Sequence, residues 1–193
     1  MLTLYFAPGS SSMAPHIALY EIGAPFDARP VSFHRRETHT PDFLALNPEG
    51  KVPVLLVDGR PLTEVAAILF YLARRYPEAG LLPADDLEAQ AQAVSWMSFI
   101  ASTLHPARRG GVEEARKVFA LADRRLGSRE WALGAYSIAD IHLFRLFWRF
   151  LPRLQPHLAD FPHLQAHHAR MMARPAVQRT IEAETAIGYE LPA

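Results

Sequence analysis

The sequence predicts an α/β half that ends near residue 75, followed by an all-helical half that begins near residue 87. Three observations lead to this prediction. Strand-like and helix-like segments alternate over the first 75 residues, residues 76–86 are rich in turn formers, and apolar residues after position 87 recur at three- and four-residue steps.

The first strand and helix are predicted from the opening residues. Leu2–Phe6 alternates apolar and less apolar positions, which is typical of a short strand. The turn Ala7–Gly9 follows, and Ser10–Ser12 offers hydroxyl groups that cap the start of a helix running to Ile22. Gly23 stands where a helix usually ends.

The next elements complete the α/β half. A second strand is expected over 26–33, and a short helical turn over 41–46. Lys51–Val57 is a compact apolar run typical of a buried strand, and Asp58-Gly59 is a strong hairpin signal. The strand after it, 60–62, should therefore pair antiparallel with the run.

Thr63 is placed to cap a helix that runs to about Arg75. The resulting order is strand, helix, strand, then strand, strand, helix. A βαβ unit followed by a hairpin and a helix is the thioredoxin-like layout. We therefore predict residues 1–75 as a thioredoxin-like domain, 76–86 as a linker and 87–193 as an all-helical domain.

Helices are expected throughout the second half. One apolar stripe runs from Leu87 to Leu104, and another from Val112 to Leu126. Ser137-Ile-Ala-Asp140 is a capping box, in which the side chain of each end residue bonds the backbone of the other. Further helices are expected from 138 to 150, from 162 to 172 and from Pro175.

Composition narrows the range of functions. The chain has 193 residues, a formal net charge of zero and no cysteine. Zero net charge argues against a nucleic-acid partner, and the lack of cysteine excludes disulfides, thiolate catalysis and Cys-based metal sites. Because the start resembles no secretory signal and no long apolar run is present, we expect a cytoplasmic protein with no membrane partner.

Ordered motifs along nearly the whole chain resemble the cytosolic glutathione S-transferase family, closest to its bacterial beta class. The fold that this resemblance implies is a thioredoxin-like domain joined to an all-helical domain. The stretches that carry it are 5–19, 47–55, 62–64, 81–83, 98–105, 137–140 and 173–177.

The resemblance implies a binding site for glutathione, the co-substrate of the family. Lys51 and the cis-proline turn Val52-Pro53 would hold its cysteinyl part through the backbone. Glu64 would pair with the γ-glutamyl amine, and the helix start at Val65 would take the γ-glutamyl carboxylate. Many family members have serine where this chain has Val65, which adds a hydroxyl donor.

Ser11 aligns with the cysteine that marks the beta class, so cysteine is replaced by serine here. The resemblance implies that Ser11, at a helix start, donates a hydrogen bond to the thiolate of glutathione. Ser10, Ser12 and Tyr5 remain rival donors, and Ser11 as a plain helix cap also remains open.

His105 aligns with a family histidine near the sulfur, where it would donate a hydrogen bond or carry a proton. The family usually has a basic residue next; here Pro106 stands there and predicts a bend. The segment between His105 and Trp131 is short relative to the family. We expect an apolar pocket for the second substrate, with four candidate residues: Met97, Phe99, Ile100 and Trp148.

The predicted function is a glutathione transferase that activates the glutathione thiol for attack on a hydrophobic electrophile. The resemblance also implies a homodimer. Two alternatives stay open: a non-catalytic glutathione-binding or scaffold protein, and a glutathione-dependent isomerase. No metal is expected; the spacing of His163 and His167 would suit one, but surface histidines explain it better.

Overall fold

The structure is a computed structural model that describes residues 1–190, without the side chains at positions 108 and 156. Internal contacts divide it into two compact units. The first unit is Met1–Tyr76 together with the C-terminal segment from Pro175, and the second is Pro77–Arg174. The predicted all-helical half included this C-terminal segment, and its residues 191–193 lie outside the described part.

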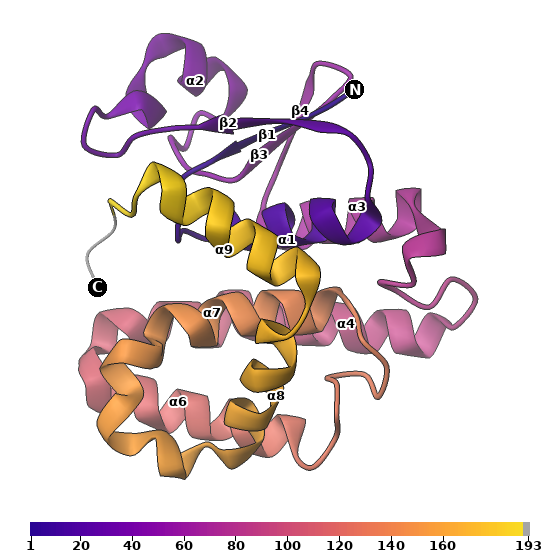
Figure 1. Ribbon diagram of the computed structural model, residues 1–193, viewed down its shortest axis with the longest axis vertical. Coiled ribbons are helices and arrows are strands. Elements are labelled where there is room, and N and C mark those ends of the chain that lie inside the picture. Colours follow the sequence, from indigo (N-terminus) through magenta and orange to yellow (C-terminus); the bar gives the residue numbers. More distant parts are fainter. Residues whose placement is uncertain (191–193) are drawn as a thin grey trace. The chain divides into compact units, whose positions relative to one another are not determined.

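A four-stranded sheet in the order β2-β1-β3-β4 forms the centre of the first unit (Figure 1). β1 pairs parallel with β2 and antiparallel with β3, and β3 pairs antiparallel with β4. This arrangement confirms the predicted βαβ unit and the hairpin at Asp58-Gly59. The strands are β1 (Leu2–Phe6), β2 (Phe26–Pro30), β3 (Val54–Val57) and β4 (Arg60–Thr63).

Helices cover both faces of this sheet. α1 (Met13–Ile22) packs against α3 (Val65–Arg75) and α9 (Pro175–Ile187) on one face, where Figure 1 shows them together. α2 (Pro41–Leu46) lies on the other face, where Phe43 meets the ring of Tyr5 at 6.0 Å. The central strands β1 and β3 are thus largely buried, as the run in β3 predicts, while the edge strands β2 and β4 are more exposed.

Several details of this unit differ from the sequence prediction, and one is the start of β3, which begins at Val54 and not at Lys51. β2 stops at Pro30 and not at residue 33, because Pro30 pairs with Phe6, the last residue of β1.

Thr63 ends β4 instead of capping α3, and Glu64 stands at the N-cap position. The Ser12 hydroxyl makes no capping bond to α1; it bonds Ala7 instead.

The second unit consists of helices, as predicted. Leu87–Phe99 continues into a π-helical segment and α5, and α7 runs to Leu154, beyond the expected end at 150. Its α-helices are α4 (Leu87–Phe99), α5 (His105–Ala107), α6 (Gly111–Leu126), α7 (Ile138–Leu154) and α8 (Pro162–Met172).

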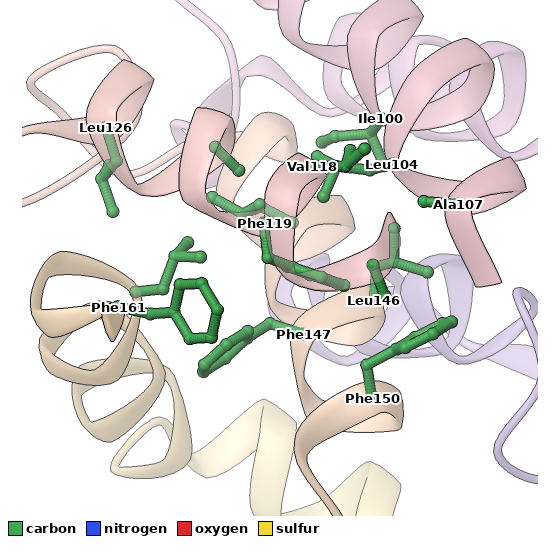
Figure 2. Close-up of a cluster of buried hydrophobic side chains, with 14 of the residues drawn as sticks. Ile100, Leu104, Ala107, Val118, Phe119, Leu126, Leu146, Phe147, Phe150 and Phe161 are labelled. Carbon is green, nitrogen blue, oxygen red and sulfur yellow. The ribbon is translucent and has the colours of Figure 1, made fainter. Parts of the chain in front are cut away.

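The core of the second unit is built from aromatic and aliphatic side chains of α4 to α8. Phe119 is fully buried and meets the rings of Phe147 at 5.8 Å and Phe150 at 5.4 Å (Figure 2). Tilted aromatic pairs at such distances add to the stabilisation from burial alone.

The stripe predicted from Val112 to Leu126 joins this cluster except at Val112, which is exposed. The stripe predicted from Leu87 to Leu104 is largely wrong, because Leu87 and Val94 are exposed and the buried side of this helix instead carries Trp96 and Ile100.

The capping box at Ser137 is confirmed at the start of α7. The Ser137 amide donates to Asp140 Oδ2 at 2.9 Å. The same carboxylate accepts from the Ala132 amide at 2.7 Å and contacts His167 Nε2 at 3.0 Å. Asp140 is fully buried, so these contacts satisfy a charge that water does not reach.

The predicted bend near Pro106 takes the form of a change in helix type. Ile100–Leu104 is π-helical, and the amide of His105 donates to the carbonyl of Ile100. Beside this turn, the Ser102 hydroxyl donates to the Ser98 carbonyl at 2.8 Å. Such π-helical turns are frequent at functional sites.

Candidate functional site

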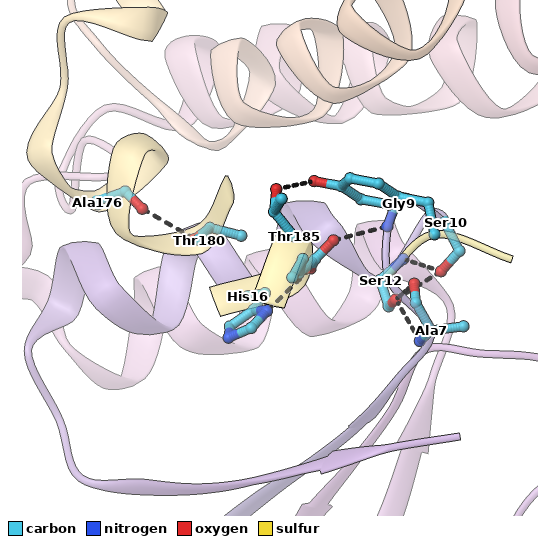
Figure 3. A network of polar contacts seen from close by, with 10 residues as sticks. Ala7, Gly9, Ser10, Ser12, His16, Ala176, Thr180 and Thr185 are labelled. Carbon is cyan, nitrogen blue, oxygen red and sulfur yellow. Dashed lines mark hydrogen bonds and ion pairs between the residues drawn. The ribbon is translucent and has the colours of Figure 1, made fainter. Parts of the chain in front are cut away.

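The turn between β1 and α1 holds three serines whose hydroxyl groups have different surroundings. The Ser12 hydroxyl donates to the Ala7 carbonyl and accepts from the Ala7 amide, both at 3.1 Å. The hydroxyl oxygens of Ser10 and Ser12 lie 2.6 Å apart, and both residues are buried. Figure 3 shows this closed set of contacts. Ser10 and Ser12 therefore hold the turn together, and their hydroxyl protons are used within it.

Ser11 is half-buried and points to a different partner. Its hydroxyl donates to the carbonyl oxygen of Val52 at 3.3 Å. The Val52-Pro53 peptide bond is cis, which confirms the turn geometry that the resemblance implied. The structure thus brings Ser11 to the cis-proline turn, 41 positions away in the sequence.

Strand register gathers the other predicted residues at the same end of the sheet. Val54 pairs with Tyr5 of β1 and with Thr63 of β4. Pro53 precedes Val54, and Glu64 follows Thr63. The cis-proline turn, the start of α3 and the turn after β1 therefore lie at one end of the sheet, as a site for one ligand requires.

The loop before the cis-proline is fixed by Asn47, which is buried. Its side-chain amide donates to the Lys51 carbonyl at 2.8 Å, and its oxygen accepts from the Glu49 amide at 3.1 Å. Lys51 is exposed, with its ammonium 2.6 Å from Glu49 Oε2. Lys51 thus contributes a backbone position held by Asn47 and a cationic group at the surface.

Glu64 has an unusual backbone conformation, with φ at 67° and ψ at 123°. A positive φ is rare for a residue with a Cβ atom, and such strain clusters at ligand sites. The side chain is exposed and makes no capping bond to α3. Val65, the first helical residue, is buried, so it presents its amide but no hydroxyl.

Tyr5, a rival donor in the sequence prediction, is engaged on the other face of the sheet. Its hydroxyl accepts from Arg29 Nη1 at 3.1 Å, and its ring packs on Phe43 of α2. The neighbouring Phe6 points the opposite way and packs on His16 of α1, with ring centroids 4.7 Å apart. Alternation along the strand thus turns Tyr5 away from α1.

Sequence reasoning missed a buried carboxylate that supports the serine turn. Glu184 of α9 is fully buried, and its Oε2 accepts from the Gly9 amide at 2.7 Å. Its Oε1 lies 2.9 Å from His16 Nδ1 (Figure 3). A signal was present, because Val177, Thr180 and Glu184 follow helical spacing on the buried face of α9. An acid within a buried stripe indicates a buried polar partner.

His105 lies in the second unit, directly after the π-helical segment, and is half-buried. It interacts electrostatically with His142 of α7, which is also influenced by Arg145. Burial holds the pKa of His142 well below its usual range, and the charges of Arg145 and His105 lower it further. The role of His105 towards a bound thiol stays a prediction.

The candidate pocket residues of the second unit are largely part of its core. Ile100 belongs to the main hydrophobic cluster, with Phe99 packed against its edge. Met97 is 3% exposed, and Trp148 is half-buried. Helical spacing alone does not separate pocket residues from core residues, so a pocket role for these four stays a prediction.

The expectation that His163 and His167 are both surface histidines is wrong for His167. His167 is buried against Asp140, while His163 is half-buried. Within residues 1–190, no group of three or more acidic or histidine side chains is arranged to hold a metal ion. Over the same residues, no helix combines the length and apolar character needed to cross a membrane.

Residues 1–74 match the family of the glutathione S-transferase N-terminal domain, and residues 84–175 match the family of the C-terminal domain. The chain therefore belongs to the glutathione S-transferase family. Glutathione S-transferase GstA of Escherichia coli O157:H7 is 32% identical over 200 residues, which cover 95% of this chain and 98% of that protein.

Solved structures extend this likeness to the fold. A sphingomonad glutathione S-transferase complexed with glutathione is 36% identical with a TM-score of 0.85, covering 95% of this chain and 98% of that one. The beta-class enzyme of Sphingomonas chungbukensis is also 36% identical, with a TM-score of 0.84 over 94% and 98% of the two chains. The predicted fold class and the resemblance to bacterial glutathione transferases are confirmed.

Proposed function

We propose that this glutathione S-transferase binds glutathione at the end of the sheet where Ser11 meets Val52. Its reaction would be attack of the glutathione thiolate on a hydrophobic electrophile. The observation that supports this proposal most directly is the 3.3 Å hydrogen bond from the Ser11 hydroxyl to the Val52 carbonyl in the cis-proline turn. The solved sphingomonad relative with bound glutathione supports the choice of co-substrate.

Ser11 is the proposed donor to the sulfur. A free thiol has a pKa of about 8.5, and each unit of depression requires about 1.4 kcal/mol of preference for the thiolate. One charge-assisted hydrogen bond contributes about 1.5–3 kcal/mol, which is one to two units. The start of α1 adds a favourable field for a negative sulfur. Together these effects populate the thiolate at neutral pH.

The backbone of Val52, with Lys51 before it and Pro53 after it, would pair with the cysteinyl part of glutathione. Ser11 would then leave the Val52 carbonyl and turn to the sulfur, because the ligand amide takes its place. The half-buried position of Ser11 allows this change, whereas the closed contacts of Ser10 and Ser12 do not.

The γ-glutamyl end would bind at the start of α3. The exposed Glu64 carboxylate would pair with the amine, and the free amides at Val65 would take the carboxylate. The strained backbone of Glu64 supports a ligand role, because strain of this kind persists where function retains it.

His105 would donate a hydrogen bond near the sulfur or carry its proton. The electrophile would bind against apolar side chains of the helical unit. We also propose a homodimer, as the resemblance to the family implies, and a cytoplasmic location.

A non-catalytic glutathione-binding protein is the second candidate. Val65 is buried and offers no hydroxyl where many relatives have serine, which weakens the γ-glutamyl subsite. The isomerase alternative is not favoured, because a maleylacetoacetate isomerase matches 63% of this chain, whereas two of the transferases described above match 95% of it. His16, near where an isomerase arginine is expected, is buried against Glu184.

Calorimetry of glutathione binding tests the proposal, with the thiolate absorbance of the bound ligand followed against pH. We expect the wild type to depress the thiol pKa by one to two units, and Ser11→Ala to reverse most of that depression. Tyr5→Phe is the matched control and should leave the pKa unchanged. Binding with an undepressed pKa would favour the non-catalytic candidate, and no binding at millimolar ligand would refute both.

A further inference from the structure

The chain after α9 turns back towards the loops of the proposed site. Gly188 has a φ of 99°, a conformation that favours glycine, and it redirects the chain at the helix end. Tyr189 and Glu190 follow, and each contacts a different loop of the first unit. None of the sequence motifs points to these two residues.

Tyr189 packs on the turn that carries Ser11. A Cβ atom placed on Gly9 would lie 2.8 Å from Cδ1 of the Tyr189 ring, so the ring lies against the bare backbone of that glycine. The Tyr189 hydroxyl lies 3.0 Å from Thr185 Oγ1, which orients the ring. Gly9 has a φ of 72°, so this turn needs a glycine for two separate reasons.

Glu190 closes the loop after β2. Its Oε1 accepts from the Ser32 hydroxyl at 2.7 Å, and its Oε2 accepts from the amides of Phe33 at 2.5 Å and His34 at 3.0 Å. These bonds, led by that of Ser32, hold the pKa of the Glu190 carboxyl below its ordinary value. The lowered pKa keeps the carboxyl an anion at neutral pH, and its side chain is 28% exposed.

Both loops adjoin the contact between Ser11 and the cis-proline turn. The amide of Val31 donates to the Phe6 carbonyl at 2.8 Å, so the segment from Ser32 starts beside the end of β1. Val31 also packs with Ala7 and Val52 in one buried cluster. Glu190 and Tyr189 therefore connect two loops that flank the same point.

We propose that Tyr189 and Glu190 form a clasp that positions these two loops for glutathione binding. The inference rests on the proposed function, and neither residue needs to touch the reacting atoms. Without the clasp, the loops must lose their freedom when the ligand binds, which weakens affinity without changing the chemical step.

The test uses the full chain with Glu190→Gln and Tyr189→Ala. Amide hydrogen exchange is measured without ligand, and the Kd, KM and kcat for glutathione are measured well below the melting temperature. We expect faster exchange at Phe33 and His34 in Glu190→Gln, and at residues 9–12 in Tyr189→Ala. Glutathione Kd and KM should rise about three- to tenfold at nearly constant kcat.

Two matched variants separate the clasp from general stability. Glu182→Gln removes an exposed carboxylate from α9 and should leave exchange and affinity unchanged. Tyr189→Phe keeps the ring against Gly9 and should retain most of the wild-type affinity. A loss of affinity that follows the melting temperature across all four variants would show a merely structural role and overturn the proposal.

Unchanged exchange in both loops would also refute the clasp. Tighter glutathione binding by Glu190→Gln would refute it too, because the carboxylate would then occupy a place that the ligand needs. If the wild type does not bind glutathione, the proposed function fails, yet the exchange measurement still decides whether the clasp holds the loops.

Discussion

The hydroxyl of Ser11 donates to the carbonyl oxygen of Val52 at 3.3 Å, across the junction between the start of α1 and the cis-proline turn. This relationship singles out one serine among three. Ser10 and Ser12 bond each other and Ala7, so they maintain the turn. Of the three serines, only Ser11 is half-buried, and it bonds the Val52 carbonyl, to which the proposed ligand would bind in its place.

Ser11→Cys should create a reactive thiol in a chain that has no cysteine. A thiolate at a helix start has a lowered pKa, so the new side chain should attack the disulfide of oxidised glutathione. The new thiolate forms a mixed disulfide with one half of oxidised glutathione, and the other half leaves as the glutathione thiolate. Intact mass spectrometry at neutral pH measures the adduct.

A second cysteine variant controls for simple exposure. Ser128→Cys places a thiol on an exposed loop residue away from any helix start, and it should react at least tenfold more slowly. Equal rates for the two variants would count against a special environment at position 11.

Glu64→Gly should affect stability and binding in opposite directions. Glycine adopts a φ of 67° without the strain that Glu64 bears, and this relief exceeds its extra unfolded-state entropy. We expect the free energy of unfolding to rise by about 1 kcal/mol and glutathione affinity to fall at least tenfold. Urea denaturation and calorimetry measure the two effects.

Glu64→Gln distinguishes the charge from the backbone. It keeps the strained conformation and removes the carboxylate, so affinity should fall while stability stays within about 0.5 kcal/mol of wild type. A Gly variant that binds glutathione as tightly as the wild type would remove Glu64 from the proposed site.

Local patterns explain why much of the fold was predictable. The hairpin at Asp58-Gly59 and the capping box at Ser137 depend on residues a few positions apart, and both are confirmed. The prediction that Thr63 caps α3 was wrong, because Thr63 pairs with Val54 and so belongs to β4, although its side chain would otherwise suit a cap. Tertiary pairing thus overrode a local preference.

Long-range contacts explain what the sequence analysis missed. Glu184 bonds the amide of Gly9 across 175 positions, and Glu190 reaches Phe33 across 157. No periodicity specifies which loop such a carboxylate meets, since that depends on how α9 returns to the sheet. The Ser11 prediction came from the resemblance. The structure shows in addition that the rival hydroxyls of Ser10, Ser12 and Tyr5 have hydrogen-bond partners within the fold.

Asp140→Ala should be among the most destabilising single substitutions in the second unit. It removes a buried carboxylate that serves the Ser137 and Ala132 amides and His167. Leaving these buried donors unpaired should lower the free energy of unfolding by about 3–5 kcal/mol. Urea denaturation measures it, and Asp85→Ala, at an exposed position in the linker, should change it by less than about 0.5 kcal/mol.

His142 should make the stability of the chain depend on pH below neutrality. Burial lowers its pKa in the folded state, so the unfolded chain binds a proton that the folded chain excludes. The sign follows from this: no penalty is present above the unfolded pKa of about 6.5, and stability falls as pH drops below it, by up to about 1.4 kcal/mol per pH unit.

The variant His142→Gln isolates this contribution, because glutamine does not titrate. Urea denaturation at several values between about pH 7.5 and 5 should show a shallower loss of stability in the variant than in the wild type. The difference between the two curves should open only on the acidic side of about pH 6.5, since His168, whose pKa is also lowered by burial, is common to both. Parallel curves over the whole range would mean that His142 is protonated as readily in the folded chain as in the unfolded one, which would contradict the effect expected from the burial of its ring.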